Sequence, residues 1–246
     1  RIRTMRALVN QKVGLGDILF SIPIAFELLK EYGEVIWPVH PPYLWLTDYF
    51  PNISFVSCED YEWLHDFGDE VYRELPQRHE LTSIPQPEHL EDDIKIINLR
   101  YANVDHRSET CMVDKYKLLG LDVNLWKTLS WERDIVKEAE LYKKLNPLDV
   151  PYNLVNKNSE YPPVKAIINI NNDLLTIDMD LVDGYSLLDW GLLIEKAINI
   201  HTVSTAVNYV VEAIGKKKQR WFVYPRSGDP NLQYVGFLSD NWSKIL

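Results

Sequence analysis

Two glycines and a carboxylate stand where the first predicted strand gives way to a helix. The strand 5–10 reads MRALVN, and it leads through Gly14 and Gly16 to Asp17. Glycine allows a positive φ and a close approach of a ligand or a neighbouring backbone, while a helix N-terminus presents unpaired N–H groups and a partial positive charge. In a parallel sheet this turn lies at the carboxyl end of a strand, where ligands bind. Asp17 is therefore a candidate ligand-facing carboxylate, and capping of the helix is the alternative.

A second strand-to-helix junction carries two hydroxyl groups. The strand 198–203 reads INIHTV, and Ser204 and Thr205 follow it at the start of a predicted helix. Hydroxyl and N–H donors converge at such a helix start, which suits a phosphate or a diphosphate. A plain Ser/Thr N-cap is the alternative. His201 lies on the same strand and is a candidate ligand contact.

The remaining motifs are weaker. The first loop is not a dinucleotide fingerprint, because Leu19 stands where the pattern G-x-G-x-x-G needs glycine, and it is not a P-loop. Asp178 and Asp180 form a D-x-D that could bind a divalent cation, although such pairs arise by chance among 36 acidic residues. His106 and Arg107 follow a strand end at which an acceptor molecule could bind, and an ordinary surface loop is the alternative. The six histidines do not cluster, and no H-E-x-x-H, C-x-x-C or G-x-S-x-G motif is present.

Strands and helices alternate along the chain, which predicts parallel sheets with helices on both faces. The predicted strands are 5–10, 34–40, 53–57, 93–100, 152–159, 166–170, 174–179, 198–203 and 220–225. The predicted helices are the one behind the first strand, 41–50, 111–121, 131–145, 186–197 and 204–214. Because Pro23 fits only in the first turn of a helix, the first regular helix is predicted to begin near Ser21.

A linker divides this pattern into two halves. The segment NPLDVPYN at 146–153 carries two prolines, and the alternation of strands and helices restarts after it. The sequence therefore predicts two α/β half-domains, over residues 5–147 and 148–246, with a cleft between them.

The composition limits the classes of function. The 246 residues carry a net charge of -10, which argues against a nucleic-acid partner. Two cysteines favour reduced thiols and a cytoplasmic location over a disulfide framework. No apolar run approaches the roughly 20 residues of a membrane span, and no signal peptide is expected.

The two junctions together resemble a known family. GLGDILFSIPIA at 14–25 resembles the N-terminal signature of the heptosyltransferase-like glycosyltransferases, in which Gly-Asp is followed by an apolar run and a proline. VSTAVNYVVEAIG at 203–215 resembles the second signature of that family, which usually reads Val-Asp-Thr-Gly before a helix. The resemblance implies the GT-B fold. Its two Rossmann-like domains face a central cleft, with the acceptor bound by the first domain and the sugar nucleotide by the second.

The resemblance also implies roles for single residues. Asp17 matches the proposed catalytic base of the family. The residues matched to the phosphate-binding positions are Gly14, Gly16, Lys157, Thr205 and Ala206. Ser204 stands where the family has an aspartate that holds the donor sugar, and Ala206 stands where it has a glycine. The candidates for sugar or acceptor contacts are His106, Arg107 and His201.

These features predict a metal-independent, inverting glycosyltransferase with no cofactor. It would move a sugar from a nucleoside-diphosphate sugar to a hydroxyl group of a glycan or glycolipid acceptor, and a peripheral membrane contact stays open. Asp17 would accept the proton of that hydroxyl, and the helix start at Ser204 and Thr205 would stabilise the leaving diphosphate. The alternatives are another sugar-nucleotide enzyme on the same fold, such as an epimerase or a hydrolase, and a non-catalytic sugar-nucleotide binding module.

Overall fold

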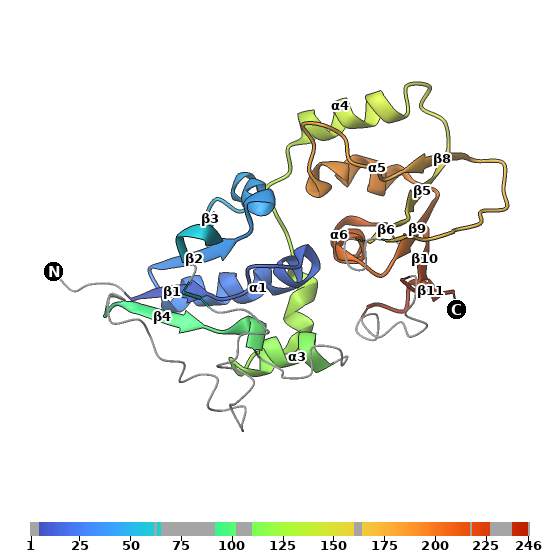
Figure 1. Cartoon of the computed structure of the whole chain (residues 1–246). Coiled ribbons are helices and arrows are strands. Elements are labelled where there is room, and N and C mark those ends of the chain that lie inside the picture. Colours follow the sequence, from blue (N-terminus) through green and yellow to red (C-terminus); the bar gives the residue numbers. More distant parts are fainter. Residues whose placement is uncertain are drawn as a thin grey trace. The chain divides into compact units, whose positions relative to one another are not determined.

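The chain folds into two compact units, Arg1–Trp131 and Glu132–Leu246, each built around a parallel sheet (Figure 1). The computed structural model describes residues 5–61, 63–64, 92–101, 110–159, 164–216, 218–226 and 238–245. Within those residues, none of the helices combines the length and the apolar character needed to cross a membrane.

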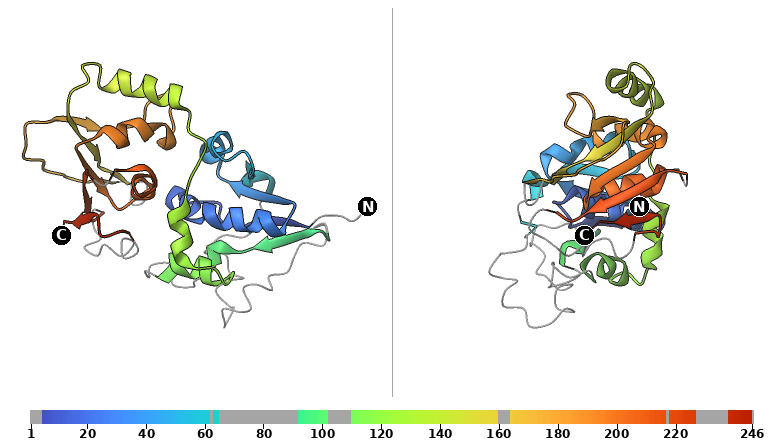
Figure 2. Two further views of the ribbon diagram at one scale, coloured as in Figure 1. Left: turned by 180° about the vertical axis from the view of Figure 1, so that it is seen from behind. Right: turned by 90° about the vertical axis from the view of Figure 1, so that its right-hand side faces the viewer.

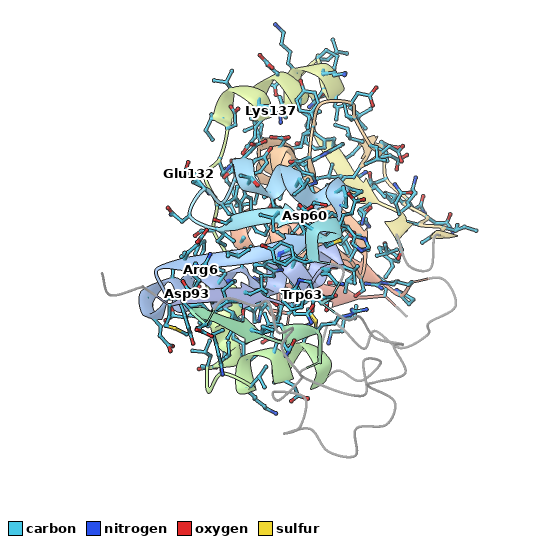
Figure 3. All side chains as sticks on the ribbon, turned by 60° about the vertical axis from the view of Figure 1, so that its left-hand side comes forward. Arg6, Asp60, Trp63, Asp93, Glu132 and Lys137 are labelled. Atoms are coloured by element: carbon cyan, nitrogen blue, oxygen red, sulfur yellow. The ribbon has the colours of Figure 1, made fainter. Side chains whose placement is uncertain are left out.

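The sheet of the first unit has the strand order β3-β2-β1-β4, and all of its strand pairs are parallel. Its strands are β1 (Arg6–Val9), β2 (Glu34–Val39), β3 (Ser54–Ser57) and β4 (Ile94–Ile97). At the amino ends of β1 and β4, the Arg6 guanidinium donates to both carboxylate oxygens of Asp93 at 3.1 and 3.2 Å (Figure 3). This pair adds a side-chain link at the end of the β1–β4 ladder, in which Arg6 is opposite Ile94. The four strands that the sequence predicts for this half are confirmed.

The helix α1 (Leu15–Glu31) runs along the first sheet and carries much of the core of this unit (Figures 1 and 2). Its Phe20 ring meets the ring of Tyr116 edge-on at 5.3 Å and stacks on Trp126 at 5.7 Å. Tyr116 belongs to α3 (Thr110–Lys117), and Trp126 to the 3-10 helix η5 (Val123–Thr128). The buried side of α1 therefore packs against α3 and η5, which follow β4 in the chain.

The predicted start of this helix near Ser21 is wrong, because α1 begins at Leu15 and contains Pro23 in its interior. A proline inside a helix costs about 3 kcal/mol. Each buried apolar side chain contributes about 1.5–3 kcal/mol, so the packing of this helix outweighs that cost. The buried apolar residues of α1 are Ile18, Leu19, Phe20, Ile22, Pro23, Ile24, Ala25 and Leu28.

The sheet of the second unit has the order β11-β10-β9-β5-β8 and is also entirely parallel. Its strands are β5 (Tyr152–Asn156), β8 (Leu175–Asp178), β9 (Asn199–Val203), β10 (Arg220–Tyr224) and β11 (Trp242–Lys244). β6 (Asn158–Ser159) and β7 (Val164–Lys165) form a separate antiparallel pair. The sequence predicted β5, β8, β9 and β10 but not β11, which pairs with β10.

Two helices cover one face of the second sheet. The Tyr152 hydroxyl donates to the carbonyl of Leu193 in α5 (Gly191–Lys196) at 2.6 Å. The indole of Trp242 donates to Glu212 in α6 (Ala206–Ile214) at 2.9 Å. Tyr152 and Trp242 lie on the same face, because the register pairs Leu154 with Ile200, Ile200 with Trp221, and Trp221 with Trp242.

The opposite face of the second sheet is covered in part by the segment 166–170. Ile168 packs with Val155 and Val203 in one apolar cluster, and Ala166 and Ile170 pack against it. The predicted strand 166–170 is wrong, because these residues form no strand in the described part of the chain, although Ile168 is buried.

The helix α4 (Ile135–Leu145) packs against α5 and the 3-10 helix η6 (Leu187–Trp190) of the second unit. Glu138 of α4 is 1% exposed. It accepts two hydrogen bonds from Arg133, at 2.8 and 2.5 Å, and Arg133 also donates to Glu195 of α5 at 3.0 Å. A buried carboxylate needs such partners, which ties α4 to the unit that begins at Glu132. The boundary between the units thus lies before α4, whereas the sequence placed it at 147 and 148, after α4.

Candidate functional site

The strand order of the first sheet reverses between β1 and β4. The chain leaves β1 for β2 on one side and returns to β4 on the other side. In open parallel sheets, ligands bind outside the carboxyl ends of the strands at such a switch point. There the Asn10 side chain donates to that of Asn98 at 3.1 Å, and the segment with Gly14 and Asp17 follows β1 directly.

Gly14 is needed for both its backbone and its lack of a side chain. It forms the N-cap of α1 with φ at 80°, a conformation that residues with a Cβ rarely adopt. A Cβ at this position would lie 2.7 Å from Oδ2 of Asp17. The carboxylate of Asp17 therefore folds back over Gly14. Gly16 lies half-buried in the first turn of α1.

Asp17 pairs with a lysine that the sequence analysis missed. Nζ of Lys115, on α3, lies 3.3 Å from Oδ1 of Asp17, and the two side chains are 4% and 32% exposed. The same ammonium group donates to Oε1 of Gln11 at 2.5 Å and to the carbonyl of Leu99 at 3.2 Å. Asp17 accepts no hydrogen bond from a backbone N–H of the described residues, so the capping alternative does not describe it.

The position of Lys115 carries a signal in the sequence. Met112 and Tyr116 lie on the buried side of α3, and Lys115 shares that side and is 3% exposed. A lysine on the buried side of a helix needs a counter-charge. Asp17 provides this negative charge, so the two groups form one electrostatic unit at the switch point of the first sheet.

The strand order of the second sheet reverses between β5 and β9. Asn156 ends β5 and Lys157 follows it, while Ser204 and Thr205 follow β9. Nδ2 of Asn156 donates to Oγ1 of Thr205 at 3.0 Å and to Oγ1 of Thr202 at 3.0 Å. The second predicted junction thus also lies at a topological switch point.

Thr205 is the N-cap of α6. Its N–H donates to Oδ1 of Asn208 at 2.8 Å, and its hydroxyl donates to the carbonyl of Val203 at 3.3 Å. The cap alternative therefore describes part of what Thr205 does. The N–H groups of Ala206 and Val207, in the first turn of α6, have no acceptor among the described residues. Ser204 is 7% exposed, and its N–H donates to the carbonyl of Tyr224 at 3.1 Å.

Lys157 and the D-x-D acids meet at the ends of β5 and β8. Nζ of Lys157 lies 2.7 Å from Oδ1 of Asp178, and Nδ2 of Asn158 donates to Oδ1 of Asp180 at 3.1 Å. No group of three or more His, Cys, Asp or Glu side chains arranged to hold a metal ion occurs among the described residues.

His201 lies inside the second unit with partners of its own. Its ring stacks on Phe222 at 4.6 Å, and its Nδ1 lies 2.9 Å from the hydroxyl of Tyr224. Burial, and then the charge of Arg220, lowers the pKa of His201 to about 4. The other two candidates for sugar or acceptor contacts, His106 and Arg107, lie outside the described residues.

Three solved structures share this arrangement of elements. A glycosyl transferase family 9 protein from Veillonella parvula DSM 2008 matches 100% of this chain and 88% of its own, with a TM-score of 0.54 and 9% identity. The E. coli ADP-heptose lps heptosyltransferase II matches 98% of this chain and 90% of its own, with a TM-score of 0.52 and 12% identity. The chain has the heptosyltransferase-like glycosyltransferase fold. The predicted resemblance is thus confirmed at the level of the fold.

The third structure is the dodecameric, iron-containing heptosyltransferase TibC of enterotoxigenic E. coli, in complex with ADP-D-β-D-heptose. It matches 98% of this chain and 62% of its own, with a TM-score of 0.52 and 11% identity. No protein-family model and no curated protein sequence matches the chain. The solved structures therefore add a likeness in three dimensions to the resemblance of the two sequence motifs.

Replacing Gly14 with alanine should destabilise the protein by about 2–4 kcal/mol. About 1–2 kcal/mol comes from the positive φ, and the rest from the overlap of the new Cβ with the Asp17 carboxylate. Gly120→Ala is the matched control, because Gly120 has φ at 67° and nothing within 4 Å of an added Cβ. Urea unfolding of both variants measures the difference. Equal losses in the two variants would show that the Asp17 carboxylate does not press on Gly14.

The stability of the protein should depend on His201 between about pH 6.5 and pH 4. The folded state holds this imidazole neutral with a pKa of about 4, while the unfolded chain protonates it near 6.5. Its contribution is therefore complete above pH 6.5 and decreases as the pH falls towards 4, by about 2–3 kcal/mol at pH 4.5. Urea unfolding of the wild type and His201→Phe at pH 7 and 4.5 tests this. The expected result is a smaller loss in the variant, and identical losses would refute it.

Proposed function

We propose that this protein is a glycosyltransferase that moves a sugar from a nucleoside-diphosphate sugar to a hydroxyl group of a glycan or glycolipid. The observation that carries the proposal is the position of the two motifs. In a fold shared with heptosyltransferases, the Gly14–Asp17 turn and the Ser204–Thr205 turn each follow the strand at the switch point of one sheet. Switch points are where such sheets bind their ligands.

The second unit would bind the donor. The N–H groups of Ala206 and Val207 and the positive end of the α6 dipole suit the oxygens of a diphosphate. Lys157 follows β5, the strand next to β9, and would add a cation, because an ammonium group has three donors and can bind a phosphate while it keeps Asp178. TibC was solved with ADP-D-β-D-heptose, which makes an adenine donor the first to try. Ser204 replaces the aspartate of the family signature, so the sugar itself stays open.

The first unit would bind the acceptor and supply the base. Asp17 accepts the proton of the acceptor hydroxyl as that oxygen attacks the anomeric carbon. The bond from the anomeric carbon to the diphosphate breaks, its electron pair leaves with the diphosphate, and the configuration inverts. Lys115 keeps the carboxylate in place throughout. The donors at the start of α6 then stabilise the leaving diphosphate, and the proposed reaction uses no metal ion.

The donor assignment predicts a loss of affinity when the Thr205 hydroxyl is removed. Thr205→Val keeps the shape of the side chain but deprives a phosphate oxygen of one donor. A hydrogen bond to a charged group contributes about 1.5–3 kcal/mol, so the affinity should fall about 10- to 150-fold. Calorimetric titration of ADP, UDP and GDP, with and without EDTA, measures this effect. Equal affinities in both proteins, or binding that disappears with EDTA and returns with manganese, would contradict the proposal.

The assignment of Asp17 requires a variant that separates catalysis from stability. Asp17→Asn should lose about 1–3 kcal/mol of stability, because it removes the negative charge 3.3 Å from the buried ammonium of Lys115 while solvent screens part of the effect. Adding Lys115→Met should return the stability to that of Lys115→Met alone, as measured by urea unfolding. Transfer should stay about 10²–10⁴-fold below wild type in the double variant, followed as release of the nucleoside diphosphate. Wild-type transfer by the double variant would exclude Asp17 as the base.

A further inference from the structure

The side-chain amide of Asn156 is held in one orientation at the end of β5. The residue is 4% exposed. Its Oδ1 accepts the N–H of Asn158 at 3.2 Å, and its Nδ2 donates to the hydroxyl oxygens of Thr202 and Thr205, at 3.0 Å each. Because a backbone N–H can only donate, the carbonyl end of the amide must face Asn158. The amino end then faces the two hydroxyls.

This orientation decides what the Thr205 hydroxyl can do. The Thr205 oxygen accepts a hydrogen bond from Asn156, and a phosphate oxygen can only accept, so the hydrogen of the Thr205 hydroxyl is the part that can bind a phosphate. That hydrogen now points to the carbonyl of Val203, at a long 3.3 Å. The Thr202 hydroxyl donates to the same carbonyl at 2.8 Å. The Val203 carbonyl therefore keeps a partner when the Thr205 hydroxyl turns away from it.

The start of α6 has donors in excess of acceptors. Asn208 is 2% exposed, and its Oδ1 accepts the Thr205 N–H at 2.8 Å, which places its amide group against the first turn of the helix. Its Nδ2 is buried and has no hydrogen-bond partner among the described residues. The N–H groups of Ala206 and Val207 are also without acceptors among the described residues. A buried donor that lacks an acceptor is costly, and an anion at this point would satisfy such donors.

We propose that Asn156 is a positioning residue for the donor diphosphate. By donating to Oγ1 of Thr205, it makes that hydroxyl a hydrogen-bond donor towards a phosphate oxygen. The amide is itself polarised by the N–H of Asn158, and hydrogen bonds in such a chain strengthen one another. This proposal rests on the proposed function, because it assumes that the helix start of α6 receives the diphosphate.

Reversing the direction of the hydrogen bond tests the proposal. In Asn156→Asp the new carboxylate can only accept, so it captures the Thr205 hydrogen and withdraws it from the phosphate. Affinity for the nucleoside diphosphate that binds best among ADP, UDP and GDP should fall more than tenfold. Asn172→Asp is the charge-matched control. Asn172 is exposed and bonds to Asn153, near the start of β5. The affinity of the Asn172→Asp variant for the same nucleoside diphosphate should stay within twofold of wild type. Thermal unfolding of each variant checks that it folds.

A double-mutant cycle with the neutral variant Asn156→Ala separates positioning from packing. Asn156→Ala should weaken diphosphate binding severalfold in the wild-type background and by less than twofold in the Thr205→Val background, because it acts through the Thr205 hydroxyl. Equal losses in both backgrounds, or no loss in either, would overturn the role of Asn156 and leave the donor site standing. Failure of wild type to bind any of the three diphosphates would overturn the proposed donor site together with this proposal.

Discussion

Both units depend on one constraint of parallel sheets, the point at which the strand order reverses. The two neighbouring strands at that point send their chains to opposite sides, so the space outside their carboxyl ends is open to loops and helix starts. In the first sheet this point lies between β1 and β4, and in the second between β5 and β9. Side chains then bridge the two strand ends, as Asn10 and Asn98 do in one unit and Asn156 and Thr205 in the other.

The two switch points differ in their charge. In the first, the ammonium of Lys115 is balanced by Asp17 and bonded to the neutral oxygens of Gln11 and Leu99. That arrangement suits a group that exchanges a proton with an uncharged hydroxyl. In the second, backbone and side-chain donors at the start of α6 lack acceptors among the described residues, and Lys157, which follows β5, is paired with Asp178 of β8. An excess of donors suits a ligand that brings only acceptors, as a phosphate does.

The sequence was sufficient for features that are local in the chain. A short apolar strand followed by glycines or hydroxyls and then by a helix defines each junction within about fifteen residues, so β1, α1, β9 and α6 were foreseen. The partners that complete each junction were not foreseen, because Lys115 meets Asp17 and Asn156 meets Thr205 only after the sheets have formed.

The start of α1 was predicted wrongly for a different reason. The free-energy cost of Pro23 inside the helix is small beside the gain from burying the apolar side of the whole of α1. Similarly, the sequence analysis assigned α4 to the first half-domain. The spacing of apolar residues in α4 does not show that Glu138 is linked through Arg133 to Glu195 in the second unit. His106 and Arg107 lie outside the described residues and stay predictions.

The all-parallel pairing of both sheets has a consequence for how the protein folds. Every parallel pair needs a crossover connection, so its contacts join residues far apart in the chain, and such topologies fold slowly. The hydrogen bond between Asn156 and Thr205 joins residues that are 49 positions apart in the chain. The hydrogen bonds between Asn10 and Asn98 and between Gln11 and Lys115 join residues that are 88 and 104 positions apart. Each doubling of a closed loop adds about 0.6 kcal/mol of entropy cost. The loop-closure entropy cost is therefore larger for the arrangement around Asp17 than for the one around Thr205. During synthesis, the arrangement around Asp17 can form only after the chain has been made as far as α3.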